Sequence, residues 1–166
     1  MKWFLSNRCD KLALPLADRH YNRQKIGSPQ FVPPGRCLVL LTENADALWA
    51  TSWPYAEYVK HRWPGAWICS LFRNESLNKA SELILDAVAC TRGKYGDPPA
   101  LGMITFINRE KVKPTRKYGY TYLRAGFKEV GETKGGLLVL QLLPESMPEA
   151  KQPNTRLNSQ LHFENI

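Results

Sequence analysis

The amino-acid sequence predicts a single α/β domain in which helices flank a mixed central sheet. Short apolar runs of strand length recur along most of the chain, and a segment with apolar residues at a helical spacing lies between two of them. Apolar strands that alternate with helices form a sheet whose faces the crossover helices cover. The length of 166 residues is that of one domain.

Six segments of strand length are expected to be strands, most of them apolar and next to turn residues. They are residues 36–41, 47–53, 67–73, 101–107, 127–133 and 137–143. A long helix is predicted to begin at Ser76 and to stop at Arg92-Gly93, with Asn78 or Ser81 as its cap. A shorter helix is predicted over residues 118–125.

Both ends of the chain are predicted to be irregular. Residues 1–35 are rich in polar residues, glycine and proline, which are typical of turns. Residues 144–166 are dominated by proline, asparagine, glutamine and charge, which predicts a flexible tail. The folded domain is therefore expected to span residues 1–143.

The chain carries a net charge of +8, from 23 Lys and Arg residues against 15 Asp and Glu residues. This surplus favours a polyanionic partner such as nucleic acid, although a merely soluble basic protein has the same composition. No stretch approaches the roughly 18 apolar residues of a membrane span, and the first residues lack the apolar run of a signal peptide. We therefore expect a cytoplasmic protein without a membrane partner.

The four cysteines, Cys9, Cys37, Cys69 and Cys90, are far apart in the sequence and form no CxxC pair. This spacing argues against a zinc site. Free and mostly buried thiols are expected instead.

The first candidate site is Arg73-Asn74-Glu75-Ser76, which joins a predicted strand to the long helix. A strand end beside a helix N-terminus is a common place for anionic ligands, and Glu75 there is suited to act as a general base. Helix capping by Asn74 or Ser76 explains the same residues equally well.

Two further segments contain candidate acid–base residues. A tyrosine one turn before Gly126 can direct its phenol into the central cleft and protonate a leaving group, although core packing explains each of Tyr118, Tyr120 and Tyr122 as well. His20, in the amino-terminal segment, titrates near neutrality and suits proton transfer. A single histidine is, however, often structural.

Aromatic and basic side chains indicate surfaces for DNA. Tyr55, Tyr58 and Trp63 lie among turn residues, so they are expected to be exposed and are suited to stack on bases. Trp49 and Trp67 are expected in the core. A basic segment between a strand and a helix is either placed to contact phosphates or simply solvated. Its cationic residues are Arg109, Lys111, Lys113, Arg116 and Lys117.

Two sets of motifs resemble known families. Tyr122-Leu-Arg-Ala-Gly126-Phe127, with a strand, a glycine-rich turn and a strand after it, resembles the carboxyl-terminal half of the GNAT acetyltransferase fold, over about residues 67–143. Four segments together resemble the Mom family of phage DNA-modification proteins, over about residues 18–143. They are Asp18-Arg19-His20-Tyr21, Gly27-Ser28-Pro29-Gln30-Phe31, Phe72-Arg73-Asn74-Glu75 and Gly102-Met103-Ile104-Thr105-Phe106.

The resemblance implies a GNAT-like fold and an enzyme that converts adenine in DNA to N6-carbamoylmethyladenine, which shields phage DNA from restriction in the host cytoplasm. It implies that His20, Glu75 and Tyr122 are catalytic groups around a flipped adenine, with double-stranded DNA along residues 109–117 and the amino-terminal segment. The implied substrate- or donor-binding residues are Tyr21, Gln30, Phe31, Arg73, Asn74, Ser76, Ser81 and Tyr118. A tRNA partner and a homodimer are compatible with this function.

The segment before the long helix bears on the donor. GNAT enzymes bind the coenzyme A pyrophosphate with a glycine-containing loop, and residues 75–81 contain no glycine, so fewer backbone N–H groups can converge on a phosphate. A glycyl group is an isomer of the carbamoylmethyl group, whereas an acetyl group lacks its nitrogen. We therefore expect an activated glycine such as glycyl-tRNA, with acetyl-CoA as the alternative. His20, Glu75 and nearby tyrosines could bind iron, but no ligand spacing demands it.

Two other functions fit the same sequence. One is an ordinary GNAT N-acetyltransferase of a small amine or protein, which would bind acetyl-CoA tightly and DNA weakly. The other is a non-catalytic DNA-binding anti-restriction protein, which would leave nucleosides unchanged in mass.

Overall fold

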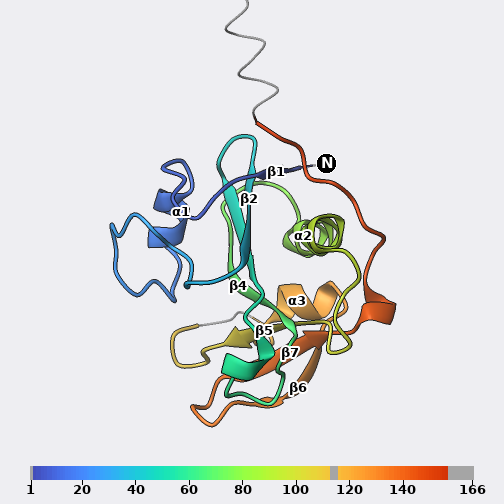
Figure 1. The fold of residues 1–166 in the computed structure, drawn as a ribbon. Coiled ribbons are helices and arrows are strands. Elements are labelled where there is room, and N and C mark those ends of the chain that lie inside the picture. The colour runs from blue at the N-terminus through green and yellow to red at the C-terminus, as the bar shows by residue number, and fades with distance from the viewer. Residues whose placement is uncertain (1, 113–115, 157–166) are drawn as a thin grey trace, which may run out of the picture.

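The computed structural model describes residues 2–112 and 116–156. They form one α/β domain around a seven-stranded mixed sheet in the order β1-β2-β3-β4-β5-β7-β6 (Figure 1). The strands are β1 (Trp3–Leu5), β2 (Cys37–Thr42), β3 (Ala47–Ser52), β4 (Trp67–Asn74), β5 (Met103–Ile107), β6 (Lys128–Glu132) and β7 (Leu138–Leu142). The helices are α1 (Leu14–Asp18), α2 (Ala80–Tyr95) and α3 (Tyr120–Arg124), with short 3-10 turns η1 (Ala56–Tyr58) and η2 (Pro144–Ser146). The predicted α/β class with a mixed sheet is confirmed.

The sheet opens between its two central strands. β4 and β5 run parallel and pair only from Trp67–Met103 to Cys69–Thr105. Beyond these pairs β4 continues along β3 and β5 continues along β7, so the two strands separate. A β-bulge in the β3–β4 pairing also leaves Ser70 without a partner on β3. A cavity therefore has room to form at this point of the sheet.

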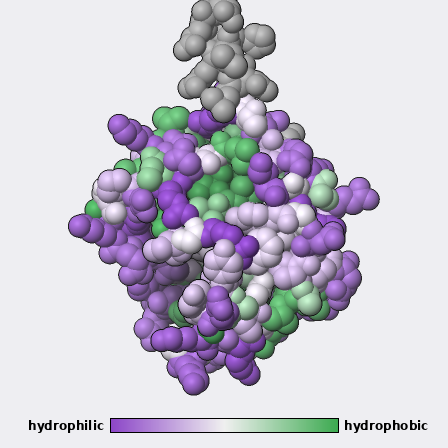
Figure 2. All heavy atoms as spheres, in the orientation of Figure 1, coloured by the Kyte–Doolittle hydropathy of each residue, from purple (hydrophilic) through white to green (hydrophobic). Residues whose placement is uncertain are grey.

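Apolar residues on both faces of the sheet form the core. α2 and α3 lie on one side of the sheet, and α1 with its following loop lies on the other (Figure 1). Trp49 and Trp67 pack under α2 in the larger cluster, as expected from the sequence. The smaller cluster joins Leu16 of α1 and Phe31 of the loop to Leu48 of β3. Polar side chains cover much of the face seen in Figure 2, with some apolar surface between them.

The amino-terminal segment is more regular than its composition predicts. It contains β1 and α1, of three and five residues. Both elements are too short to show a hydrophobic period, and Pro15 lies in the first turn of α1, where the helix needs no backbone donor. The prediction that residues 1–35 are irregular is therefore wrong for these two elements, because they are stabilised by tertiary packing that local composition does not show.

The segment after Pro144 differs from the expected flexible tail as far as residue 156. Asn154 bonds to β1 through both backbone groups, accepting from Leu5 N–H at 2.8 Å and donating to Trp3 O at 3.0 Å. The Lys151 N–H donates to Ala89 O of α2 at 3.0 Å, and a side chain at Gly93 would collide with the Lys151 carbonyl. The segment is therefore held by backbone contacts that polar composition does not reveal. The remainder of the expected tail, residues 157–166, lies outside the described residues.

α2 is shifted relative to its predicted bounds. It begins at Ala80 rather than Ser76, and the preceding Lys79 provides no side-chain cap. Neither Asn78 nor Ser81 is the cap that the sequence suggested. The helix continues past Gly93 to Tyr95 and ends at Gly96, whose φ of +82° suits glycine.

Candidate functional site

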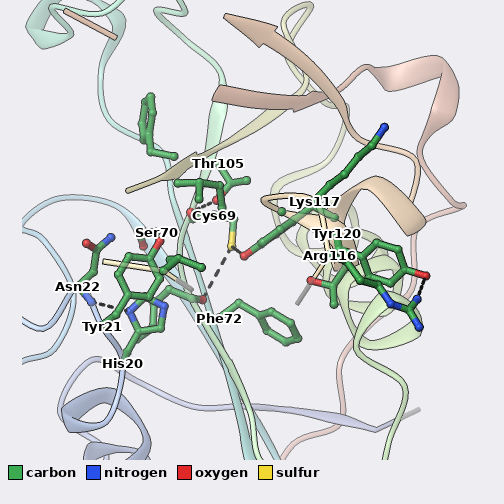
Figure 3. Close-up of a pocket in the computed structure, with 17 residues that line it drawn as sticks. His20, Tyr21, Asn22, Cys69, Ser70, Phe72, Thr105, Arg116, Lys117 and Tyr120 are labelled. Atoms are coloured by element: carbon green, nitrogen blue, oxygen red, sulfur yellow. Dashed lines mark hydrogen bonds between the residues drawn. The ribbon is translucent and has the colours of Figure 1, made fainter. Parts of the chain in front are cut away.

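A cavity of about 390 Å³ lies where β4 and β5 separate (Figure 3). Its walls come from four parts of the chain: the loop after α1, the second half of β4, the end of β5, and α3 with the residues before it. His20, Tyr21, Asn22, Cys69, Thr105 and Tyr122 are among the polar residues that line it. The volume falls within the range of small-molecule sites.

An internal ion pair shapes the loop after α1. The Arg23 guanidinium donates to Asp18 Oδ1 at 2.8 Å, to the Ser28 carbonyl at 2.6 Å and to the Gln30 carbonyl at 3.2 Å. The hydrogen bond from Arg23 lowers the pKa of Asp18. These bonds of Arg23 to Asp18, Ser28 and Gln30 hold the loop in place. The loop presents the side chains of His20, Tyr21 and Asn22 to the cavity.

His20 is a neutral hydrogen-bond donor at pH 7. Burial, together with the nearby positive charge of Arg73, lowers the pKa of His20 to about 4. Its Nδ1 accepts the backbone N–H of Asn22 at 3.2 Å, which leaves the proton on Nε2. The ring also packs against Tyr21, with 4.6 Å between centroids. His20 therefore offers an N–H rather than a free base in this arrangement.

Tyr122 and Cys69 form the buried floor of the cavity. The Tyr122 hydroxyl lies 3.5 Å from Cys69 Sγ, and its ring packs edge-on against Phe72 and Phe127. Burial raises the pKa of Tyr122 well above its usual value and raises that of Cys69 to about 12. Tyr122 thus packs in the core and lines the cavity at once. Its core packing is confirmed, and its role as an acid stays a prediction.

Cys69 is a cavity residue that sequence reasoning missed. It was expected only as a buried thiol, and it is buried. It stands at the last β4–β5 pair, opposite Thr105, and a single thiol within an apolar strand gives no signal of that place. Because the thiolate is the nucleophilic form, a pKa near 12 argues against a nucleophile.

Glu75 lies outside the residues that line the cavity. Arg19 donates to both of its carboxylate oxygens, at 2.7 and 2.8 Å, and Arg73 donates to Oε2 at 2.8 Å. These hydrogen bonds lower the pKa of Glu75 to about 2. Of the three predicted catalytic residues, the cavity therefore brings together His20 and Tyr122 but not Glu75. A carboxylate held by two arginines is a poor general base.

The residues after β4 form a closed polar turn. Asn74 Oδ1 accepts the backbone N–H of Ser76 at 3.0 Å and its hydroxyl at 2.6 Å. The Ser76 Oγ accepts the Asn78 N–H at 3.1 Å, and Asn74 Nδ2 donates to the Asn78 carbonyl at 2.8 Å. These two predicted binding residues are thus occupied with one another. Neither of them caps α2, which begins at Ala80 after Lys79, so the capping explanation is wrong.

The other predicted binding residues are divided among several places. Gln30 and Phe31 line a second cavity of about 590 Å³ that shares His20 with the first. Ser81 is buried in the first turn of α2. Tyr118 is exposed and lines neither cavity.

The basic segment reaches the rim of the first cavity through Arg116 and Lys117. The Arg116 guanidinium lies 4.5 Å from the centre of the Tyr120 ring and bonds to its hydroxyl. Lys111 is exposed, whereas Arg109 is paired with Glu132. Lys113 lies outside the described residues.

An aromatic patch of Trp53, Tyr55 and Tyr58 lies near a third cavity, of about 290 Å³, which Arg36 and Pro54 help to line. Tyr55 and Tyr58 are exposed by 59% and 76%, as expected, and Arg36 lies 4.3 Å from the Trp53 ring and 4.5 Å from the Tyr55 ring. The expectation that Trp63 is exposed is wrong, because Trp63 packs into a small buried cluster with Ile104 and Val139.

Within residues 2–112 and 116–156, no group of three or more His, Cys, Asp or Glu side chains is placed to hold a metal ion. No helix of that same part is long and apolar enough to cross a membrane. Comparisons with protein-family models, with curated proteins and with solved structures find no match to this chain. Function is therefore argued from the chemistry of the site and from the sequence resemblance.

Proposed function

We propose that this protein is a transferase that modifies the N6 amine of adenine in DNA, giving the N6-carbamoylmethyl product that the sequence resemblance implies. One observation carries the proposal. The cavity between β4 and β5 has neutral polar and aromatic walls, and Arg116 and Lys117 stand at its rim. A flipped adenine is neutral, and the phosphates next to it are anionic.

The walls suit a planar base. Four aromatic side chains line the cavity: Tyr21, Phe72, Phe106 and Tyr120. Aromatic side chains stack on any of the four bases, because every base has a π-face. The mixed seven-stranded sheet is compatible with the GNAT-like architecture. Both features favour an adenine site over a surface that only contacts the DNA backbone.

His20 is suited to polarise the acyl group of the donor. A neutral imidazole that donates from Nε2 stabilises negative charge as it develops on a carbonyl oxygen. The Asn22 N–H holds Nδ1 and so keeps the proton on Nε2. We assign His20 this electrophilic role in place of a general base.

Tyr122 is suited to protonate the leaving group. With glycyl-tRNA as donor, the N6–C bond forms and the ester C–O bond breaks, N6 loses one proton and the leaving ribose oxygen gains one. A phenol with a raised pKa stays protonated until that strongly basic oxygen appears. In the isomerisation of the glycyl to the carbamoylmethyl group, the N6–C(O) and Cα–N bonds break and the N6–Cα and C(O)–N bonds form, so no atoms or electrons are added or removed.

The turn before α2 supports a donor other than acetyl-CoA. The backbone N–H groups of Ser76 and Asn78 are already used inside the turn. Fewer donors are then free for a pyrophosphate than in a glycine-rich loop. This favours activated glycine, although the donor is decided by experiment.

The test is nucleoside mass spectrometry of DNA from cells that express the chain, followed by reactions of the purified protein with isotope-labelled glycyl-tRNA or acetyl-CoA. We expect an adenosine heavier by a carbamoylmethyl group, with label from glycine. Label from acetyl-CoA alone would reject the glycyl donor. Unmodified nucleosides from DNA that the protein binds would reject the transferase and favour a DNA-binding anti-restriction protein.

A further inference from the structure

Three cavities meet around the loop after α1. The cavity between β4 and β5 and the second cavity of about 590 Å³ have been described. A third, of about 290 Å³, extends towards Arg36 and Pro54 beside the aromatic patch. Asn22 and Ser70 line all three. A ligand that enters from any of these directions therefore comes close to these two side chains.

The two shared side chains differ in their hydrogen bonds. The Ser70 hydroxyl accepts from Ser52 Oγ at 3.0 Å and lies 3.4 Å from the Ala50 carbonyl. Asn22 uses its backbone N–H for His20 and its backbone carbonyl for Gln24, but its carboxamide has no partner within the described part of the chain. Figure 3 shows this carboxamide turned away from the His20 ring.

An unused carboxamide at such a junction is a recognition group. Asn22 is half-buried, and leaving polar atoms in a partly dehydrated place unpaired has a free-energy cost that a ligand can remove. Two of its polar neighbours are engaged: Arg23 holds the loop together, and Ser70 bonds across the sheet. The carboxamide of Asn22 is thus available for an incoming molecule.

We propose that the Asn22 carboxamide recognises the amino-bearing edge of adenine. A carboxamide presents one acceptor and one donor side by side. Adenine presents its N6 amino donor beside a ring-nitrogen acceptor, and Asn pairs with such an edge through two hydrogen bonds. This inference rests on the proposed function and assigns its base specificity to one residue outside the predicted set.

The test compares two ligands that differ only in the amino group, 2′-deoxyadenosine and purine 2′-deoxyriboside. Their affinities are measured by NMR titration for the natural protein, for Asn22→Ala and for Asn44→Ala. Asn44 is an exposed asparagine in the β2–β3 turn and serves as the matched control. Thermal unfolding of each variant confirms that it is folded.

We expect the natural protein and Asn44→Ala to favour deoxyadenosine about tenfold, which is the size of one good base-edge contact. In Asn22→Ala the preference should fall to about one, because the amino group has lost its partner. An unchanged preference in Asn22→Ala, or no preference in the natural protein, would overturn the inference. If the preference depends on Asn22 but cellular DNA contains no modified adenine, the proposed transferase fails while the recognition role stands.

Discussion

Two neighbouring groups of polar residues differ in charge state, because burial acts on one group and ion pairing on the other. In the cavity between β4 and β5, burial keeps His20, Cys69 and Tyr122 uncharged. Just past the end of β4, Glu75 lies between Arg19 and Arg73, and pairing keeps it ionised. Polar residues only a few positions apart along the chain thus lie in different environments. Cys69 of β4 lines the neutral cavity, whereas Glu75 lies in a charged cluster at the surface.

The contrast shows which residues can respond to a ligand. A neutral donor in a partly dehydrated cavity has few competing partners, so its hydrogen bonds to a substrate are effective. A carboxylate that already accepts three hydrogen bonds from two guanidinium groups is committed to the fold of its loop. We therefore expect variants in the cavity to affect activity more than variants in the cluster.

The largest expected effect is that of Tyr122→Phe. It removes the proposed acid without changing the packing of the ring, so the rate of adenine modification should fall about 100-fold or more. The melting temperature should change little, because the contact of this hydroxyl with Cys69 Sγ is long, at 3.5 Å, and the ring keeps its packing. Nucleoside mass spectrometry over a time course measures the rate, and calorimetry measures the melting temperature.

Tyr120→Phe is the matched control for this prediction. Tyr120 lies on the same helix and lines the same cavity, but its hydroxyl bonds to Arg116 on the exposed side. Its removal should lower the rate only a few-fold. Equal losses in the two variants would mean that the buried phenol is not the acid.

The next largest effect is a pH dependence of stability that comes from the burial of His20. Because the folded-state pKa of His20 is about 4 and the unfolded value is about 6.5, the unfolded chain binds more protons between these values. The stabilisation by neutral His20 is complete above pH 6.5 and is lost as pH falls towards 4. It should amount to about 2 kcal/mol between pH 7.5 and pH 5.

Urea unfolding of the natural protein and of His20→Gln at these two pH values measures this stabilisation. Glutamine keeps hydrogen-bonding capacity but does not titrate, so the natural protein should lose about 2 kcal/mol more than the variant. Equal losses would show that His20 is solvated rather than buried.

Much of the sheet could be predicted from the sequence, because β2 to β5 and β7 are apolar runs that match the structure closely. β1, α1 and the segment from Pro144 to residue 156 could not. β1 and the carboxyl-terminal segment depend on contacts with each other, such as the bonds between Asn154 and β1, whereas α1 depends on packing against β3 and β4. The composition of all three is that of loops. Hydrophobic period is a local signal, and these elements are stabilised by distant residues.

The site was predicted in part. His20 and Tyr122 are 102 residues apart in the sequence and share a cavity, as the resemblance implied. Cys69 and Asn22 were missed, because a thiol in a strand and an asparagine in a loop have no distinctive pattern. Glu75 was misplaced because its bidentate pairing with Arg19, 56 residues away, is a tertiary contact.

A smaller effect is expected from Glu75→Gln. An exposed ion pair contributes about 1 kcal/mol or less to stability, and a residue outside the cavity should change the rate less than tenfold. A general base at this position would instead cost at least about 100-fold. The rate and the unfolding free energy are compared with those of Glu57→Gln, an exposed carboxylate in η1 with no ion pair described. A large rate loss confined to Glu75→Gln would show that the charged cluster, and not only the cavity, takes part in the reaction.

The smallest effect is expected at the cationic rim of the cavity, formed by Arg116 and Lys117. There the measured quantity is the salt dependence of DNA binding rather than the rate. Lys117 is exposed at the edge of the cavity, where one phosphate contact would make log Kd rise with log salt concentration with a slope of about 0.9. Lys117→Gln should therefore weaken DNA binding only a few-fold at physiological salt and reduce the slope of that dependence by about one. Lys94→Gln, at the exposed end of α2, should leave the slope unchanged. Fluorescence anisotropy with a labelled duplex over a range of salt concentrations measures both variants. Identical slopes for the two would remove the rim from the DNA path, because an electrostatic contact cannot be lost without releasing fewer counterions.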